Sequence, residues 1–590
     1  MKRNKNHITA FLSLLILGAM LVGCSKDFLD RRPLTEISEL DVWTDPNLAR
    51  AFVSKMYEDM DHGFAEVMIS SLTDESRFIH DYNTSRVLQG NIGPDEHGAA
   101  WNFANWGKFY TVIRNTNMFL ENVESVPFRS DEDKNQLTGE VYFHRAYNHF
   151  CLWRMYGGVP IITQTFGLDD NEAIQSISRN TYEETVNFII EDIDRAVGLL
   201  SDDTPRGLAN KSAARALKSR VLLYAASDLY NKAGNANALV GYTGGNQQAR
   251  WTAAKDAAWD IIDGGRFALY QPGESATENY ANIFLDKGNS EVIFSKLFHR
   301  ELLGTAHDLY NGPNGYNNWG GNVPLQNMVD VYQMEDGSAF SWSNAVHKAA
   351  PYENRDPRFY ATILYNGAPW KKRGDNGIGL DPVGVIQTAQ YEYWDGSAVQ
   401  TRWGLDTRNS PIENWNGTYS GYYLRKFMDI TLNAQFFRGD QDWIFFRYGE
   451  ILLNYVEACI ELGQEAEAKK YLKMIRGRAG MPEADVDAAS EDALRELYRY
   501  ERRVELAYEG HRFFDARRWM TAEVDFDVPA RGIEIYGKLQ PDRETLVYEY
   551  TPVNIQDRAF PIKMYFMPVP INEIRINGKL EQNPEYIQTQ

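Results

Sequence analysis

Cysteine is scarce in this chain, which has only three among its 590 residues: Cys24, Cys151 and Cys459. Secreted domains that rely on disulfides carry many more cysteines for their length, so the sequence excludes a disulfide framework. Cys151 and Cys459 each lie inside an apolar helical pattern, which predicts two buried free thiols.

Short motifs of common catalytic machinery are also missing. The sequence has no Gly-x-Ser-x-Gly elbow, phosphate-binding loop, dinucleotide fingerprint or His-Glu-x-x-His pair. The one grouping that would suit a metal, calcium, is Asp375, Asn376 and Asp381. We therefore expect no enzyme and no resident cofactor, with a carboxylate pair for glycoside hydrolysis left open by the 81 acidic residues.

Positive charge is in deficit, with 61 Lys and Arg against 81 Asp and Glu and a net charge of −20. Residues 1–23 carry three basic and no acidic residues, so a chain that begins at Cys24 has a net charge of −23. An acidic surface repels phosphate backbones, so nucleic acid is not an expected partner.

Long apolar runs are absent except at the N-terminus. Three basic residues precede the apolar stretch from Ile8 to Val22, and Gly23 precedes Cys24. This pattern predicts a signal peptide over residues 1–23, because the stretch is shorter than the roughly 20 residues of a spanning helix; a short transmembrane anchor is the alternative. A small residue before cysteine resembles the bacterial lipobox, which implies a lipid anchor of several acyl chains on Cys24.

Aromatic residues, in contrast, are plentiful: 34 Tyr, 29 Phe and 14 Trp make up 13% of the chain. A core cannot hold all of them, so some are expected to line a ligand-binding surface.

Helical periodicity dominates residues 24–265 and returns after residue 445. The clearest helix is 181–200, where Thr181 and Glu184 predict a capping box and Val186, Ile189 and Ile193 lie on one apolar stripe. Helices of this kind fall into about four antiparallel pairs: 47–62 with 106–123, 140–156 with 181–200, 213–230 with 251–263, and 450–478. We expect a mainly α fold in which tetratricopeptide-like pairs stack on one another.

Residues 266–590 form the second predicted region, and within it 270–445 lacks helical stripes. This segment is rich in Gly, Asn, Pro, Trp and Tyr and holds seven of the 14 tryptophans. It predicts a loop-rich insertion with short strands, for example at 292–294 and 360–365. Loops carried on a rigid scaffold are where binding usually resides.

Several segments along the chain together resemble one family. They are Asp27-Phe28-Leu29-Asp30, Trp106 to Asn117, Tyr156-Gly157-Gly158-Val159-Pro160, Arg355-Asp356-Pro357-Arg358, Arg447 to Leu453, Glu501 to Arg512 and Pro568-Val569-Pro570. In this order they resemble the SusD/RagB family of outer-membrane lipoproteins of Bacteroidetes.

The resemblance implies a non-enzymatic glycan-binding lipoprotein at the cell surface, anchored to the outer membrane through Cys24. Members of the family deliver oligosaccharide or polysaccharide to a SusC-like TonB-dependent transporter. Asp27 and Asp30 fit the acidic residues that accompany export to the surface. Two alternatives are a RagB-like peptide-uptake component and a lipid-anchored glycoside hydrolase.

Candidate glycan-binding residues lie in aromatic loops, because an aromatic ring can meet the C–H face of a sugar while amide and guanidinium groups meet its hydroxyls. The first loop, 311–322, contains Tyr316, Asn318 and Trp319; the alternative is a turn that packs its own tryptophan. The other candidates are Phe78, His80 and Asn83 in loop 74–83, Trp370 and Arg373 in a basic run, and Trp394 beside Tyr391 and Tyr393.

The charged run from Glu501 to Asp515 has a structural interpretation. Its acidic and basic residues lie three and four positions apart in a helical region, so they can form ion pairs within and between helices.

Overall fold

The computed structural model describes residues 39–167, 169–432 and 439–587. The predicted signal peptide and Cys24 lie outside this part of the chain. Within it, no helix combines the length and the apolar character that crossing a bilayer requires. Cys151 and Cys459 are buried free thiols, as predicted.

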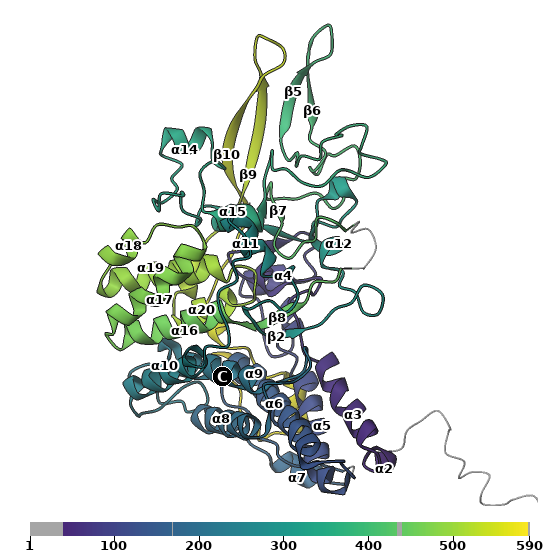
Figure 1. The fold of residues 1–590 in the computed structure, drawn as a ribbon, viewed down its shortest axis with the longest axis vertical. Coiled ribbons are helices and arrows are strands. Elements are labelled where there is room, and N and C mark those ends of the chain that lie inside the picture. Colours follow the sequence, from purple (N-terminus) through teal and green to yellow (C-terminus); the bar gives the residue numbers. More distant parts are fainter. Residues whose placement is uncertain (1–38, 168, 433–438, 588–590) are drawn as a thin grey trace, which may run out of the picture.

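Stacked helical pairs form the lower half of the molecule (Figure 1). Their helices are α3 (Pro46–Glu58), α5 (Trp106–Asn122), α6 (Asp131–Tyr156), α8 (Tyr182–Leu199), α9 (Lys211–Ala226), α10 (Gln247–Asp263), α16 (Tyr448–Glu461) and α17 (Glu465–Arg478). Within pairs, α6 packs on α8, α9 on α10 and α16 on α17, while α8–α9 and α10–α16 contacts join successive pairs. This confirms the predicted mainly α fold, except that α5 packs chiefly along α6 and α3 lies against both.

Helix α8 shows why these residues form helices. The Thr181 hydroxyl accepts from the backbone N–H of Glu184, and the Glu184 carboxylate accepts from the backbone N–H of Thr181. This capping box satisfies two N–H groups that the first turn would otherwise leave unpaired. Val186, Ile189 and Ile193 are buried along one stripe of the helix, as their spacing predicts.

The remaining helices are shorter, apart from α19. They are α2 (Glu39–Val42), α4 (Thr84–Leu88), α7 (Asn171–Ser176), α11 (Ala276–Asn282), α12 (His307–Asn311), α13 (Gln326–Val329), α14 (Ala345–Ala349), α15 (Pro357–Thr362), α18 (Ala484–Ala488), α19 (Glu491–Glu505), α20 (Arg512–Arg518), α21 (Ala522–Asp525) and α22 (Ile571–Ile576).

Strands are short and scattered, with one exception. Antiparallel pairs form between β1 (Ser76–Phe78) and β3 (Asn322–Pro324), β2 (Val292–Lys296) and β8 (Trp443–Arg447), and β4 (Ile363–Leu364) and β7 (Tyr423–Leu424). The exception is a four-stranded sheet in the order β10 (Leu546–Gln556), β9 (Ala530–Leu539), β5 (Gln390–Trp394) and β6 (Val399–Trp403). These four strands project from the end of the molecule opposite α2, and we call them the tower (Figure 1).

The predicted strand at 360–365 is wrong over most of its length. Asp356 accepts from the N–H of Arg358 and Pro357 occupies the first helical turn, so helix α15 begins there and continues to Thr362. Only Ile363 and Leu364 enter a strand. The other predicted strand, at 292–294, is confirmed by β2.

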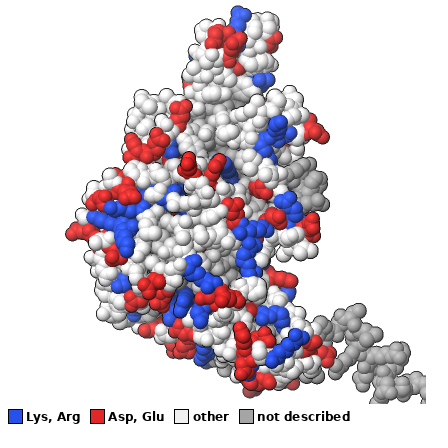
Figure 2. Space-filling model, viewed as in Figure 1, with Lys and Arg blue, Asp and Glu red and all other residues white. Residues whose placement is uncertain are grey.

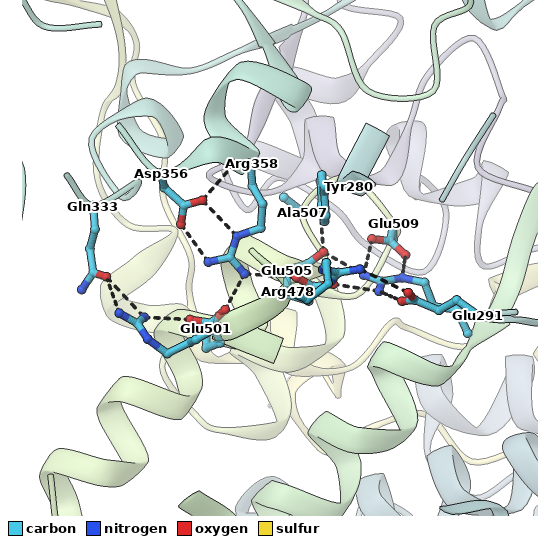
Figure 3. Close-up of polar contacts among 12 residues, drawn as sticks. Tyr280, Glu291, Gln333, Asp356, Arg358, Arg478, Glu501, Glu505, Ala507 and Glu509 are labelled. Carbon is cyan, nitrogen blue, oxygen red and sulfur yellow. Dashed lines mark hydrogen bonds and ion pairs between the residues drawn. The ribbon is translucent and has the colours of Figure 1, made fainter. Parts of the chain in front are cut away.

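A buried ion-pair network joins the loop-rich insertion to the C-terminal helices (Figure 3). Glu505 of α19 lies against three guanidinium groups, those of Arg358, Arg447 and Arg478, with N–O distances of 3.1 Å to Arg358 and 2.8 Å to Arg447. Glu291, just before β2, pairs with Arg447 at 2.7 Å and Arg478 at 3.1 Å. All five side chains are at most 2% exposed. The structural interpretation of the charged run is thereby confirmed.

Replacing Glu505 tests how strongly the fold depends on this network. Glu505→Gln keeps the shape of the side chain but removes the charge that three buried guanidinium groups share. We expect the free energy of unfolding to fall by roughly 3–5 kcal/mol, because buried charge is left uncompensated. Urea unfolding followed by circular dichroism measures it. The matched control is Glu496→Gln on the exposed side of α19, paired with Arg499 at 3.3 Å, where a change within about 0.5 kcal/mol is expected. Equal effects of the two substitutions would refute the role given to Glu505.

Candidate functional site

Pairing of β1 with β3 brings together two loops that are far apart in the sequence. Phe78 lies opposite Asn322, and the backbone N–H of Ile79 extends the ladder by donating to the Gly321 carbonyl at 2.9 Å. The buried Asn322 side chain accepts from the N–H of Met68 at 2.9 Å and donates to the Glu66 carbonyl at 2.8 Å. This ladder places the residues after β1 beside those just before β3.

The chain after β1 adopts a strained turn. Asp81, Tyr82 and Asn83 have φ values of 68°, 43° and 64°, in the left-handed region that non-glycine residues rarely adopt. The Asp81 carboxylate holds the turn by accepting from the backbone N–H and the hydroxyl of Ser85, at 2.7 and 2.8 Å. Strain of this kind collects at functional sites, and here the Tyr82 ring is left 57% exposed.

The loop between β6 and β7 supplies a third wall. The Glu413 carboxylate accepts from the backbone N–H of Trp415 at 2.6 Å, and the Trp415 side chain is 70% exposed. Tyr419 follows, with the guanidinium carbons of Arg408 and Arg77 at 3.9 and 4.2 Å from the centre of its ring. These cation–π contacts fix the orientation of the ring.

These three walls enclose a hollow of about 480 Å³, which we call the aromatic hollow. Its lining residues are Glu66, Ile79, His80, Tyr82, Trp319, Arg408, Trp415, Asn416 and Tyr419. The rings of His80 and Trp415 lie nearly parallel, with centroids 6.2 Å apart and an angle of 19°. Ligand sites in proteins usually have volumes of roughly 300–1,000 Å³, so the hollow is large enough for a small molecule or one part of a polymer.

Chemically, the aromatic hollow suits binding. Ring faces can pack against the C–H faces of a ligand, while Arg408, Asn416 and Glu66 can form hydrogen bonds to its polar groups. Among the described residues that line it, Glu66 supplies the one carboxylate, whereas glycoside hydrolysis generally uses a pair. Burial lowers the pKa of His80, which favours the neutral form of its ring.

Two acidic residues directly before β1 anchor this site to the scaffold. Asp74 forms ion pairs of 2.7 Å with Arg503 and 2.9 Å with Arg512. Burial alone would raise the pKa of Asp74, but these two charges outweigh it and lower the pKa to about 2. Burial raises the pKa of Glu75 to about 7, although Glu75 accepts from the backbone N–H of Tyr508 at 3.1 Å.

The structure brings together two of the predicted ligand-binding residues, His80 and Trp319, on opposite loops of the aromatic hollow. Asn83 is exposed beside Tyr82 but does not line the hollow. Phe78 and Asn318 are each 2% exposed, and Phe78 packs beneath His80 and Tyr82 with ring centroids 5.6 and 5.2 Å away. Phe78 therefore supports the site from below.

Other predicted residues lie elsewhere. Arg373 has a fully buried side chain that pairs with Asp381 and Asp406, each at 2.8 Å, and its guanidinium lies 4.4 Å from the ring centre of Tyr316. Trp370 is only 9% exposed. Tyr316 and Arg373 line a separate hollow of about 570 Å³. These three side chains lie apart from the aromatic hollow, so we leave them out of the candidate site.

The calcium grouping and Trp394 also lie apart from the aromatic hollow. Asp381 is committed to Arg373 and to the N–H groups of Gly384 and Val385, at 2.9 Å each, which does not favour a calcium site with Asp375. In the described ranges no cluster of three or more His, Cys, Asp or Glu could hold a metal ion. Trp394 lies on the tower, with the guanidinium of Arg543 3.8 Å from its ring centre.

Sequence reasoning missed Tyr82, Arg408, Trp415 and Tyr419. The segment from Asn414 to Tyr419 combines Asn, Trp, Gly and Tyr, which is the same signal that identified loop 311–322. Applied to the whole insertion, that signal would have found Trp415 and Tyr419.

The raised pKa of Glu75 gives a pH-dependent test of the anchor beneath the site. Its pKa rises from an ordinary 4.5 to about 7, so the folded state binds a proton more tightly than the unfolded state. The stability that this proton confers is therefore lost as the pH rises from about 4.5 to about 7. Glu75→Gln cannot ionise, so its stability does not change with the charge of residue 75. The free energy of unfolding of the variant minus that of the wild type should therefore increase across this window, by up to roughly 3 kcal/mol. Denaturant unfolding at pH 4.5, 6 and 8 measures this difference. A difference that does not depend on pH would contradict the raised pKa of Glu75.

Comparison with known proteins agrees with this architecture. A family model described as the SusD family matches residues 285–586, and one described as starch-binding associating with outer membrane matches residues 27–223.

SusD-like protein P38 of Formosa agariphila is 23% identical over 99% of this chain and 100% of its own length. The crystal structure of a SusD-like protein from Bacteroides fragilis superimposes with a TM-score of 0.75 at 26% identity, covering 94% of this chain and 100% of that one. A laminarin binding SusD-like protein shares the fold, with a TM-score of 0.60 at 19% identity over 92% of this chain and 100% of its own. The chain belongs to the SusD family.

Proposed function

We propose that this chain is a surface lipoprotein that binds oligosaccharide or polysaccharide at the aromatic hollow and delivers it to a SusC-like TonB-dependent transporter. The observation that carries the proposal is the convergence of five rings on one hollow, those of His80, Tyr82, Trp319, Trp415 and Tyr419. They come from three separate loops, so no single turn accounts for their meeting.

The physical fit is to a sugar. A pyranose ring has C–H groups on its faces and hydroxyls at its rim, so it can pack on Trp415 or Trp319 while Arg408 and Asn416 bind its hydroxyls. Glu413 and the two arginines around Tyr419 hold the rings in place before the ligand arrives, which lowers the entropy lost on binding. The names of two relatives, a laminarin binding and a carbohydrate binding SusD-like protein, support the same class of ligand.

Membrane attachment is the second part of the proposal. The pattern of Ile8 to Val22, Gly23 and Cys24 supports a lipid anchor on Cys24. The description of the family model that matches residues 27–223 includes association with the outer membrane. A lipid-anchored binding protein beside a transporter raises the local concentration of glycan at the entrance of that transporter.

Trp415→Ala and Trp319→Ala test the site. Each removes one stacking ring from the hollow, and we expect each to weaken glycan binding by about tenfold or more, as is typical for aromatic side chains that become buried on binding. Isothermal titration against laminarin, amylopectin, xylan, galactomannan and polygalacturonate identifies the glycan and measures the loss.

The control for both variants is Trp403→Ala, because Trp403 is 42% exposed on the tower and lies outside the aromatic hollow. Its affinity should equal that of the wild type. Heat of binding from peptides but from no glycan would favour peptide uptake, and release of new reducing ends would favour a glycoside hydrolase.

Cys24→Ala tests the anchor. The wild type should label with an alkyne analogue of palmitate and sediment with outer membranes, whereas Cys24→Ala should do neither. In mild detergent the wild type is expected to co-purify with a large outer-membrane barrel protein. Labelling of the variant would show that Cys24 is not the lipidated residue, and a wild type that purifies alone would count against the transporter.

A further inference from the structure

The tower presents a second group of aromatic residues that the aromatic hollow does not use. Tyr391 of β5 lies opposite Arg402, whereas its neighbour Gln390 lies opposite Trp403. Because side chains alternate along a strand, Tyr391 and Trp403 lie on opposite faces of the sheet. Tyr548 and Tyr550 of β10 share the face of Tyr391 across strand β9.

Gly537 of β9 lets two of these rings approach each other. It lies between Tyr391 and Tyr548 in the ladder, and a Cβ atom there would be 2.8 Å from the Cβ of Tyr391 and 2.9 Å from the Cε1 of Tyr548. Any other residue would push the rings away from the sheet. The ring of Tyr550 continues the row, with its centroid 6.4 Å from that of Tyr548.

Together with a neighbouring loop, this row encloses a hollow of about 340 Å³, which we call the tower hollow. The rest of the lining comes from Leu546 of β10 and from Asn366, Gly367, Val385, Ile386, Gln387 and Ala389, so two residues with carboxamide side chains share the hollow with the tyrosines. None of the described residues that line it is charged. Rings, hydroxyls and amides without charge suit an uncharged sugar. The guanidinium of Arg402, the cross-strand partner of Tyr391, is stacked on that ring, 4.8 Å from its centre.

The tower hollow is fixed to the same scaffold as the aromatic hollow. Asp406 donates its backbone N–H to the Gln387 carbonyl at 2.9 Å, and its carboxylate accepts from the N–H of Gln387 at 2.8 Å. Gln387 lines the tower hollow, and Arg408, two residues after Asp406, lines the aromatic hollow. On the other side, Ile533 of β9 donates to the carbonyl of Ser420, next to Tyr419.

We propose that the tower hollow is a second carbohydrate-binding site, which binds an uncharged segment of the same polysaccharide that occupies the aromatic hollow. The proposal rests on the proposed function of the aromatic hollow. A polymer held at both places gains affinity over a short oligosaccharide, because the second contact is intramolecular. The tower lies at the end of the molecule opposite α2, where the described chain begins (Figure 1).

The distribution of charge on the surface of the tower is consistent with a ligand that is recognised by stacking on aromatic rings. On the face shown in Figure 2, acidic and basic side chains are interspersed and do not gather into a single-sign patch on the tower. Steering of a charged partner needs such a patch. Capture here therefore depends on contact with the rings.

The test compares a long and a short probe on variants that spare the aromatic hollow. The long probe is the polysaccharide of the five above that the wild type binds, and the short probe is its hexasaccharide. Affinity gel electrophoresis with the long probe should show Tyr391→Ala/Tyr548→Ala binding about tenfold more weakly than the wild type, with the hexasaccharide affinity by titration unchanged. Tyr548→Ala alone, on an edge strand, should show a smaller loss in the same direction and guards against misfolding of the double variant, whose thermal unfolding is measured in parallel.

Trp403→Ala, on the opposite face of the same hairpin, is the matched control and should bind both probes like the wild type. Wild-type affinity of folded Tyr391→Ala/Tyr548→Ala for the long probe overturns the second site and leaves the aromatic hollow intact. Equal losses for both probes would place the tyrosines in the primary site and also overturn the proposal. A wild type that binds none of the five polysaccharides overturns both proposals together.

Discussion

Buried ion pairs are the constraint on which the rest of this structure depends. Glu505 faces Arg358, Arg447 and Arg478 in the interior, and a charge removed from water is tolerated only when its partners are close and correctly oriented. These partners come from α15, the end of β8 and α17, so satisfying Glu505 fixes the insertion against the helical pairs. In the same way, the ion pairs of Asp74 with Arg503 and Arg512 fix the start of strand β1, which leads to His80. The position of the binding loops is therefore set by charges that never contact a ligand.

Because the fold depends on these buried ion pairs, the charged segments that carry the family resemblance have a structural role. The residues that line the aromatic hollow, in contrast, are not part of any periodic pattern. Helical stripes and capping residues act over three or four positions, and that is why α8 and its capping box follow directly from Thr181, Glu184 and the spacing of Val186 and Ile189. The aromatic hollow instead joins residues near 80, 319 and 415. The first two of these segments meet through the β1–β3 ladder and the bonds of Asn322, neither of which leaves a local signal.

The sequence accordingly predicted the scaffold more completely than the site. His80 and Trp319 were predicted because each lies in a loop with aromatic, Asn or acidic neighbours; Trp415 and Tyr419 carry the same signal but were not singled out. The ion pairs of Arg373 could not be predicted, because its partners Asp381 and Asp406 lie 8 and 33 positions away and a basic run looks the same whether it is solvated or buried. Likewise, no local sequence pattern predicts that β5 pairs in parallel with β9, which lies more than a hundred residues later in the chain.

Rigidity of the scaffold has a direct consequence for binding. A ring that must stack on a sugar loses side-chain freedom when the ligand arrives, and that cost reduces affinity unless the ring is already held. Here Tyr419 lies against Arg77 and Arg408, and Tyr391 lies against Arg402, so each ring is restrained before binding. The strained turn at Asp81, Tyr82 and Asn83 persists only because Ser85 and the anchored strand β1 hold it. The buried charges thus affect binding indirectly. They stabilise the backbone, and a rigid backbone keeps the exposed aromatic rings oriented in water.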